Sequence, residues 1–159
     1  MATAYAPRPA RPSRAAESWR RPSAAGWSLA AVDTAVTLAE AFVTATLRRW
    51  RLTELVDAAS AVAVALVRRA VLTTGRPGPL PRHLDTATLR GVGEIKLWVR
   101  WEAPHRLRIA VWDKSPREPQ ARRLDTHLAA VDKESRGRWA SYHAHGSGKV
   151  IWADIEANG

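Results

Sequence analysis

An apolar stretch with strand-like alternation ends in an acidic side chain and a turn, and this acid is the first candidate for chemistry. The stretch is Ile-Ala-Val-Trp-Asp-Lys-Ser-Pro, residues 109–116, with Asp113 closing the apolar run. A strand that ends in this way can deliver a carboxylate to a ligand or a partner. Asp followed by Ser-Pro is also ordinary turn chemistry. A ligand contact and a structural turn therefore both remain open for Asp113.

Two adjacent arginines, Arg68 and Arg69, interrupt a second stretch that is otherwise almost wholly apolar. A guanidinium offers hydrogen-bond donors and no acceptor, so Arg69 could pair with a phosphate but would repel a magnesium ion. The alternative is that this arginine forms the charged, exposed edge of a buried helix. Elsewhere, His143 and His145 alternate along a strand without an evident third metal ligand, and Gly146-Ser147-Gly148-Lys149 has the character of a hairpin turn.

The overall charge favours anionic partners. The 159 residues include 25 Lys and Arg against 15 Asp and Glu, which leaves a formal net charge of +10, and they include no cysteine for disulfides or thiolate metal sites. Residues 1–24 hold five arginines, one glutamate and four prolines, so we expect a disordered basic tail, or alternatively an arm that grips an anion. The chain start has no apolar segment typical of a secretory signal, so we expect a cytoplasmic protein without membrane association.

Hydrophobic spacing predicts that the elements needed to position these side chains lie in one domain, residues 25–159. The spacing is helical over 32–47 and over 53–72, where Thr53 is expected to cap the second helix, and Gly and Pro residues predict a loop insertion over 73–93 with one short helical turn at 85–89. The remaining expected elements are a hairpin (strands 95–101 and 107–111), a helix (119–135), a second hairpin (139–145 and 149–156) and a first strand within 19–29. Segregated elements of this kind predict an α+β fold, a two-layer sandwich with helices on one face of a mainly antiparallel sheet.

The tryptophans of the first hairpin alternate in an informative way. Trp98 and Trp112 lie in the opposite phase from their aliphatic neighbours, which places them on the other face of the sheet. An aromatic face bordered by Arg100, Arg106 and Arg108 would serve as a protein docking surface or as a stacking platform for nucleic acid. It could equally be covered by the tail or by a second copy in a homodimer.

Three stretches make residues 27–156 resemble the GHKL histidine-kinase-like ATPase domains, in particular the anti-sigma-factor serine kinases of actinobacteria. They are Trp50-Arg51-Leu52-Thr53-Glu54-Leu55-Val56-Asp57, the run from Leu107 to Pro116, and Gly148-Lys149-Val150-Ile151-Trp152-Ala153. The resemblance implies a Bergerat-type ATPase fold that holds ATP or ADP with magnesium.

Site residues follow from the resemblance by position. It places Asp113 at the aspartate that contacts adenine and Ser115 in the first glycine box. It places Ala65 at the general-base glutamate and Arg69 at the magnesium-binding asparagine, so the residues for both functions are replaced. The second glycine box is expected within 121–127, where no glycine occurs. Nucleotide binding is therefore expected to be impaired and magnesium binding is not expected.

Three functional hypotheses follow. The first is a pseudokinase that binds a sigma factor or an anti-sigma antagonist without phosphorylating it. The second is an ATP-binding regulator, or a weak serine kinase, with an altered pocket in which Arg69 takes over the charge of the metal. The third is a basic nucleic-acid-binding protein that uses the tail and the arginine-flanked tryptophans.

Overall fold

The computed structural model describes residues 24–75, 92–102, 105–115 and 126–157. In chain order the elements are β1 (Ala24–Ala30), α2 (Thr34–Arg49), the 3₁₀ turn η2 (Thr53–Leu55), α3 (Val56–Thr74), β2 (Glu94–Glu102), β3 (Arg106–Asp113), α5 (Thr126–Ser135), β4 (Trp139–His143) and β5 (Lys149–Glu156).

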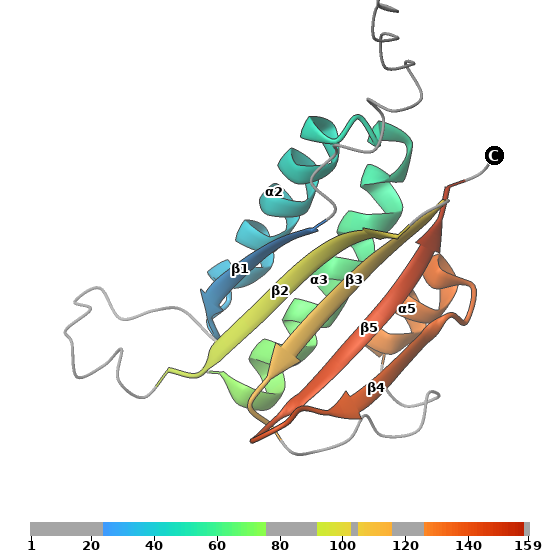
Figure 1. Ribbon diagram of the computed structural model, residues 1–159. Helices are drawn as coiled ribbons and strands as arrows, with labels where there is room; N and C mark the ends of the chain where they lie inside the picture. The colour runs from blue at the N-terminus through green and yellow to red at the C-terminus, as the bar shows by residue number, and fades with distance from the viewer. Residues whose placement is uncertain (1–23, 76–91, 103–104, 116–125, 158–159) are drawn as a thin grey trace, which may run out of the picture.

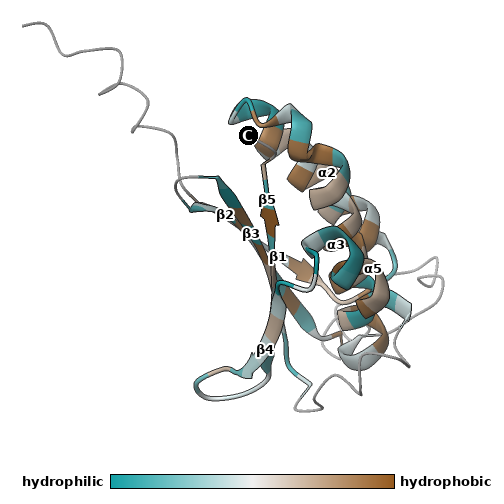
Figure 2. Ribbon diagram, turned by 90° about the vertical axis from the view of Figure 1, so that its right-hand side faces the viewer, coloured by the Kyte–Doolittle hydropathy of each residue, from teal (hydrophilic) through white to brown (hydrophobic). Residues whose placement is uncertain are grey.

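The five strands form one antiparallel sheet in the order β1-β2-β3-β5-β4. Helices α2, α3 and α5 lie together on one face of this sheet, and no described helix covers the other face (Figure 1). A side view separates the two layers, with the strands in one and the helices in the other (Figure 2). The predicted α+β class and the two-layer arrangement are therefore confirmed at this level.

Helix α3 forms the centre of the helical layer because its sequence is apolar on nearly every side. Its 19 residues contain no Gly or Pro, and Asp57 in the first turn complements the positive end of the helix dipole. Ten of these residues are buried. The helix ends where the Gly75 N–H bonds the carbonyl of Val71, and a Cβ on this glycine would collide with the backbone of Ala31.

Some predicted boundaries were wrong. The loop insertion does not begin at residue 73, because α3 continues through Thr74, and Ala24, assigned to the tail, is the first residue of β1. Thr53 does not cap α3: it begins η2, and the helix starts at Val56 without a side-chain cap. The tail before Ala24, the helical turn at 85–89, the helix start at 119–125 and the glycine-box residues 121–125 lie outside the described residues.

The strand register assigns each side chain to a face. The row Ile95, Leu97 and Val99 of β2 faces the helices together with the alternate residues of β3 and β5, and these side chains are buried. The opposite phase forms what we call the open face. Its central residues are Lys96, Trp98, Arg100, Arg108, Ala110, Trp112 and Trp152. The prediction that Trp98 and Trp112 lie on the face away from the core is therefore confirmed.

Candidate functional site

Asp113 lies at the last position of β3, and the register places it beside Lys149, the first residue of β5. Both side chains point into the helix side of the sheet, since they share the phase of Val111 and Ile151. The tight turn before Lys149 joins β4 to β5, and the start of β5 pairs with the end of β3. Gly148 in that turn adopts a positive φ of 79° and packs against the carbonyl of Asp113 so closely that no Cβ would fit.

One oxygen of the Asp113 carboxylate accepts three hydrogen bonds. Its Oδ1 accepts hydrogen bonds from Lys149 Nζ at 2.7 Å, from the backbone N–H of Ser115 at 2.9 Å and from the Thr74 hydroxyl at 3.0 Å. The bond from Ser115 is the local turn interaction that the Asp-x-Ser sequence favours. The bond from Lys149 is a buried ion pair, because the Asp113 residue and the Lys149 residue are each only 1% exposed. Asp113 is therefore a turn acid, and it is also half of an internal salt bridge.

Arg69, on helix α3, lies near enough to Lys149 to interact with its charge. It is 5% exposed, whereas its neighbour Arg68 is exposed. The interpretation of Arg69 as the charged, exposed edge of a helix is therefore wrong. Its position on the inner side follows from helical periodicity, since it lies three and seven residues after Leu66 and Val62, which are both buried. We call Arg69, Asp113 and Lys149 the buried ion cluster.

Burial and charge act together on Lys149. Loss of hydration lowers the pKa of its ammonium group below the usual value, and the nearby positive charge of Arg69 lowers it further. The hydrogen bond and the negative charge of Asp113 oppose this shift but do not cancel it. The cluster thus holds two cations against one carboxylate in an environment that disfavours charge.

The other two expected site residues border this cluster. Ser115 is 7% exposed, and its carbonyl accepts a second bond from Lys149 Nζ at 3.3 Å. Ala65 lies one helical turn before Arg69 on α3 and is buried, so its methyl group contributes packing and no acid–base chemistry. The structure therefore brings Arg69, Asp113 and Ser115 around Lys149, a residue to which the sequence analysis gave no part in the site.

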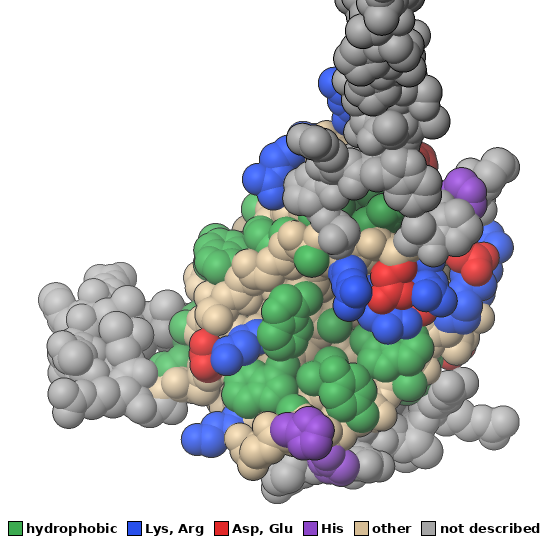
Figure 3. Space-filling view, in the orientation of Figure 1, with side chains coloured by type: hydrophobic (Ala, Val, Ile, Leu, Met, Phe, Trp, Pro, Cys, Tyr) green, Lys and Arg blue, Asp and Glu red, His purple; other side chains and the backbone are tan. Residues whose placement is uncertain are grey.

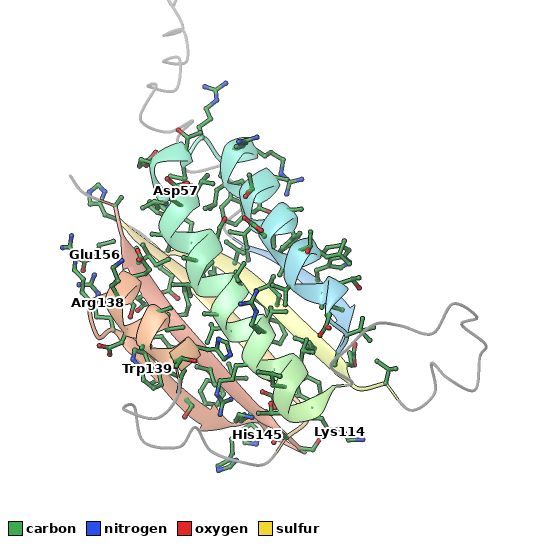
Figure 4. The ribbon with its side chains drawn as sticks, turned by 180° about the vertical axis from the view of Figure 1, so that it is seen from behind. Asp57, Lys114, Arg138, Trp139, His145 and Glu156 are labelled. Atoms are coloured by element: carbon green, nitrogen blue, oxygen red, sulfur yellow. The ribbon has the colours of Figure 1, made fainter. Side chains whose placement is uncertain are left out.

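In the view from the helix side, Lys114 and His145 mark the end of the sheet where the cluster lies (Figure 4). Arg138 and Glu156 mark the other end, where they form an ion pair of 2.8 Å beside a hollow of about 290 Å³. Equal numbers of acidic and basic side chains line that hollow, which gives it no preference for a charged ligand: Glu54, Glu134 and Glu156 face Lys133, Arg136 and Arg138.

The described residues form neither a metal cluster nor a membrane-spanning helix. The described residues include no group of three His, Asp or Glu side chains that could hold a metal ion, and His143 with His145 makes no such group. Among the described helices, none combines the length and apolar character needed to cross a lipid bilayer.

Comparison of the sequence with models of known protein families gave no match, and comparison with curated proteins gave none. The resemblance to histidine-kinase-like ATPases therefore rests on the quoted motifs.

Proposed function

We propose that this chain is a non-catalytic relative of the anti-sigma-factor serine kinases, a pseudokinase of the histidine-kinase-like ATPase fold. In this proposal it acts in the cytoplasm by stoichiometric binding of a protein, such as a sigma factor or an anti-sigma antagonist, and transfers no phosphate. A five-stranded antiparallel sheet covered on one face by three described helices is compatible with that fold. The replacement of both catalytic side chains by Ala65 and Arg69 supports the absence of catalysis.

The observation that carries the proposal is the bond between Lys149 and Asp113. An adenine amino group that needed the Asp113 carboxylate would have to compete with an ammonium group 2.7 Å away in a site closed to water. Displacing that ammonium would leave a buried charge without its partner, which costs about 3–5 kcal/mol. A cost of this size weakens binding by roughly a hundredfold or more. The residue that would recognise adenine is thus already occupied by a side chain of the protein.

One observation favours the alternative, an ATP-binding regulator with an altered pocket. The buried ion cluster places the Arg69 guanidinium near Lys149, and a guanidinium suits a phosphate group. In that alternative Arg69 pairs with the phosphates in place of magnesium.

Calorimetric titration with ATP and ADP, each with and without magnesium, separates the two functions. We expect no saturable heat at millimolar nucleotide, and the same result for Asp113→Ala. The alternative requires binding that is measurable in the natural protein and collapses in Asp113→Ala.

The partner is to be identified by pull-down from the native cell, and the purified pair is then examined by analytical ultracentrifugation. We expect a complex of fixed stoichiometry that forms equally well with and without ATP. Phosphorylation of an antagonist serine with repeated turnover would refute the pseudokinase proposal.

A further inference from the structure

The open face of the sheet carries a second set of side chains, separate from the buried ion cluster on the helix side. We propose that this open face binds single-stranded nucleic acid, with bases stacked on its indoles and phosphates paired with its cations. This inference goes beyond the proposed protein-binding function and does not depend on it. In the space-filling view, large apolar side chains gather at the middle of this face, and Lys and Arg side chains lie around them (Figure 3).

The aromatic part is a row of indoles separated by small side chains. Across the five strands one register row contains small side chains and indoles in alternation: Gly26, Trp98, Ala110, Trp152 and Ala140. The indole of Trp98 lies over Gly26, where a Cβ would come within 2.7 Å of its Cδ1. With strands about 4.8 Å apart, the backbone positions of Trp98 and Trp152 lie roughly 10 Å apart, with Ala110 between them. Trp98 is 38% exposed, so a planar base can stack on its indole.

Cations alternate with the aromatic side chains along the same strands. Lys96 and Arg100 flank Trp98 on β2, and Lys96 also lies 5.3 Å from the centre of the Trp112 ring. Arg108 lies 4.2 Å above Trp152. Proteins that bind single strands independently of sequence stack the bases on aromatic rings and place Lys and Arg beside those rings.

The strand residues of the open face carry equal numbers of acids and cations, and each acid lies within 4.0 Å of a Lys or Arg: Glu94, Glu102, Asp154 and Glu156 against Lys96, Arg100, Arg106 and Arg108. Asp154 accepts two bonds from Arg108, at 2.7 and 2.8 Å, and Glu102 accepts one from Arg106 at 2.6 Å. Arg100 approaches Glu102 only to 3.8 Å, and its side chain is 65% exposed. Arg100 is therefore the cation best placed to meet a phosphate.

The net charge of the whole chain favours nucleic acid over a second copy as the occupant. The chain carries +10, and the basic segment before Ala24, with five arginines and one glutamate, joins the sheet at the residue paired with Arg100. Two copies of a chain with this net charge repel each other, whereas a polyanion with planar rings uses both the cations and the indoles of the open face.

Fluorescence anisotropy of the full chain with fluorescein-labelled dT₁₂ and U₁₂, at about 50 mM and about 200 mM salt, tests the proposal. We expect saturable binding that weakens with salt, and weaker binding to a duplex of equal length. Trp98→Ala should weaken binding roughly five- to a hundredfold. Gly26→Ala should also weaken it, because the new methyl group displaces the indole without removing it.

The chain offers matched controls for both parts of the surface. Trp27 is 40% exposed, close to the 38% of Trp98, but it faces the helix side and packs on Phe42, so Trp27→Ala should leave binding within about twofold. Arg100→Glu and Arg49→Glu change the net charge equally, and only the first lies on the open face, so only the first should lower the salt dependence.

Four outcomes would overturn the proposal. The first is the absence of saturable binding at tens of micromolar protein, and the second is duplex binding as tight as single-strand binding. The other two are an equal loss of affinity in the two tryptophan variants and an equal loss of affinity in the two arginine variants. A change of oligomeric state in Trp98→Ala, seen by analytical ultracentrifugation, would assign the face to a second copy instead. None of these results depends on nucleotide binding at Asp113, so this inference and the proposed function can fail separately.

Discussion

Replacing Lys149 by methionine removes one half of a buried ion pair and leaves the other half in place. Asp113 would then keep a carboxylate that is 1% exposed and bonded only by the neutral donors Ser115 N–H and Thr74 hydroxyl. Loss of one partner from such a pair costs about 3–5 kcal/mol. The charge of Arg69 nearby should hold the loss toward the lower end of this range. Even so, the loss is a large share of the roughly 5–15 kcal/mol by which a domain is stable.

Urea unfolding at neutral pH, followed by the fluorescence of the eight tryptophans, measures this loss. At an m-value of about 2 kcal/mol/M, the midpoint of Lys149→Met should fall by roughly 1.5–2.5 M. Asp113→Asn should cost a similar amount, because it leaves the ammonium group without a negative partner. Asparagine at position 113 keeps an oxygen that can accept hydrogen bonds from Ser115 and Thr74. The combined variant, Asp113→Asn with Lys149→Met, should therefore lose at least about 2 kcal/mol less of the free energy of unfolding than the sum of the losses in the two single variants.

Two results would refute this reasoning. A loss below about 1 kcal/mol in Lys149→Met would mean that water reaches the pair. Strict additivity in the double variant would mean that the two side chains do not interact. Either result would also remove the argument that the ammonium group competes with adenine at Asp113.

Three further predictions concern pH, the tight turn and the core. Burial lowers the pKa of Lys149, so between the folded-state pKa and the ordinary value of 10.5 the unfolded chain binds more protons than the folded chain. This lysine therefore makes the free energy of unfolding rise with pH across that window. Urea midpoints measured toward alkaline pH should rise less in Lys149→Met than in the natural protein, and an equal slope would contradict the lowered pKa. Gly148→Ala should lower the free energy of unfolding by more than about 2 kcal/mol, because the new Cβ would meet the backbone of Asp113. Gly146 also has a positive φ but no atom near its Cβ, so Gly146→Ala should cost only about 1–2 kcal/mol. Equal losses in thermal unfolding would mean that the close contact between Gly148 and Asp113 is absent. On α2, Leu47 is fully buried and Leu38 is 43% exposed, so Leu47→Ala should cost about 2–5 kcal/mol and Leu38→Ala less than about 1 kcal/mol. Similar losses in urea unfolding would mean that α2 does not turn Leu47 toward the core and Leu38 toward solvent.

Alternation and helical spacing predicted the architecture well because they report directly on burial. The phase of Trp98 and Trp112 against their aliphatic neighbours was enough to place both on the open face, as the register confirms. Boundaries were less accurate where tertiary contact decides them. The chain passes from η2 into α3 without the expected Thr53 cap, since this end is held by packing of Leu52 and Leu55 in the core.

The ion pair at the candidate site was missed because its members are 36 residues apart in the sequence. A signal was nevertheless present. Asp113 has the inward phase of Ile109 and Val111, and Lys149 has the inward phase of Ile151 and Ala153. Two opposite charges at inward positions on strands that pair with each other predict a salt bridge, once the pairing is known. Strand order is not encoded locally, which is why the sequence alone did not give it.

The strand order has a consequence for how the molecule is made. β5 follows all the other described strands in the sequence, yet it lies between β3 and β4 in the sheet. During synthesis β3 therefore has an open hydrogen-bonding edge until residues 149–156 leave the ribosome, and β4 has no strand to join. Any chain that stops short of β5 would leave the hydrogen-bonding edge of β3 unpaired and leave the Asp113 carboxylate without Lys149. Premature termination should thus yield an aggregation-prone fragment rather than a smaller working domain.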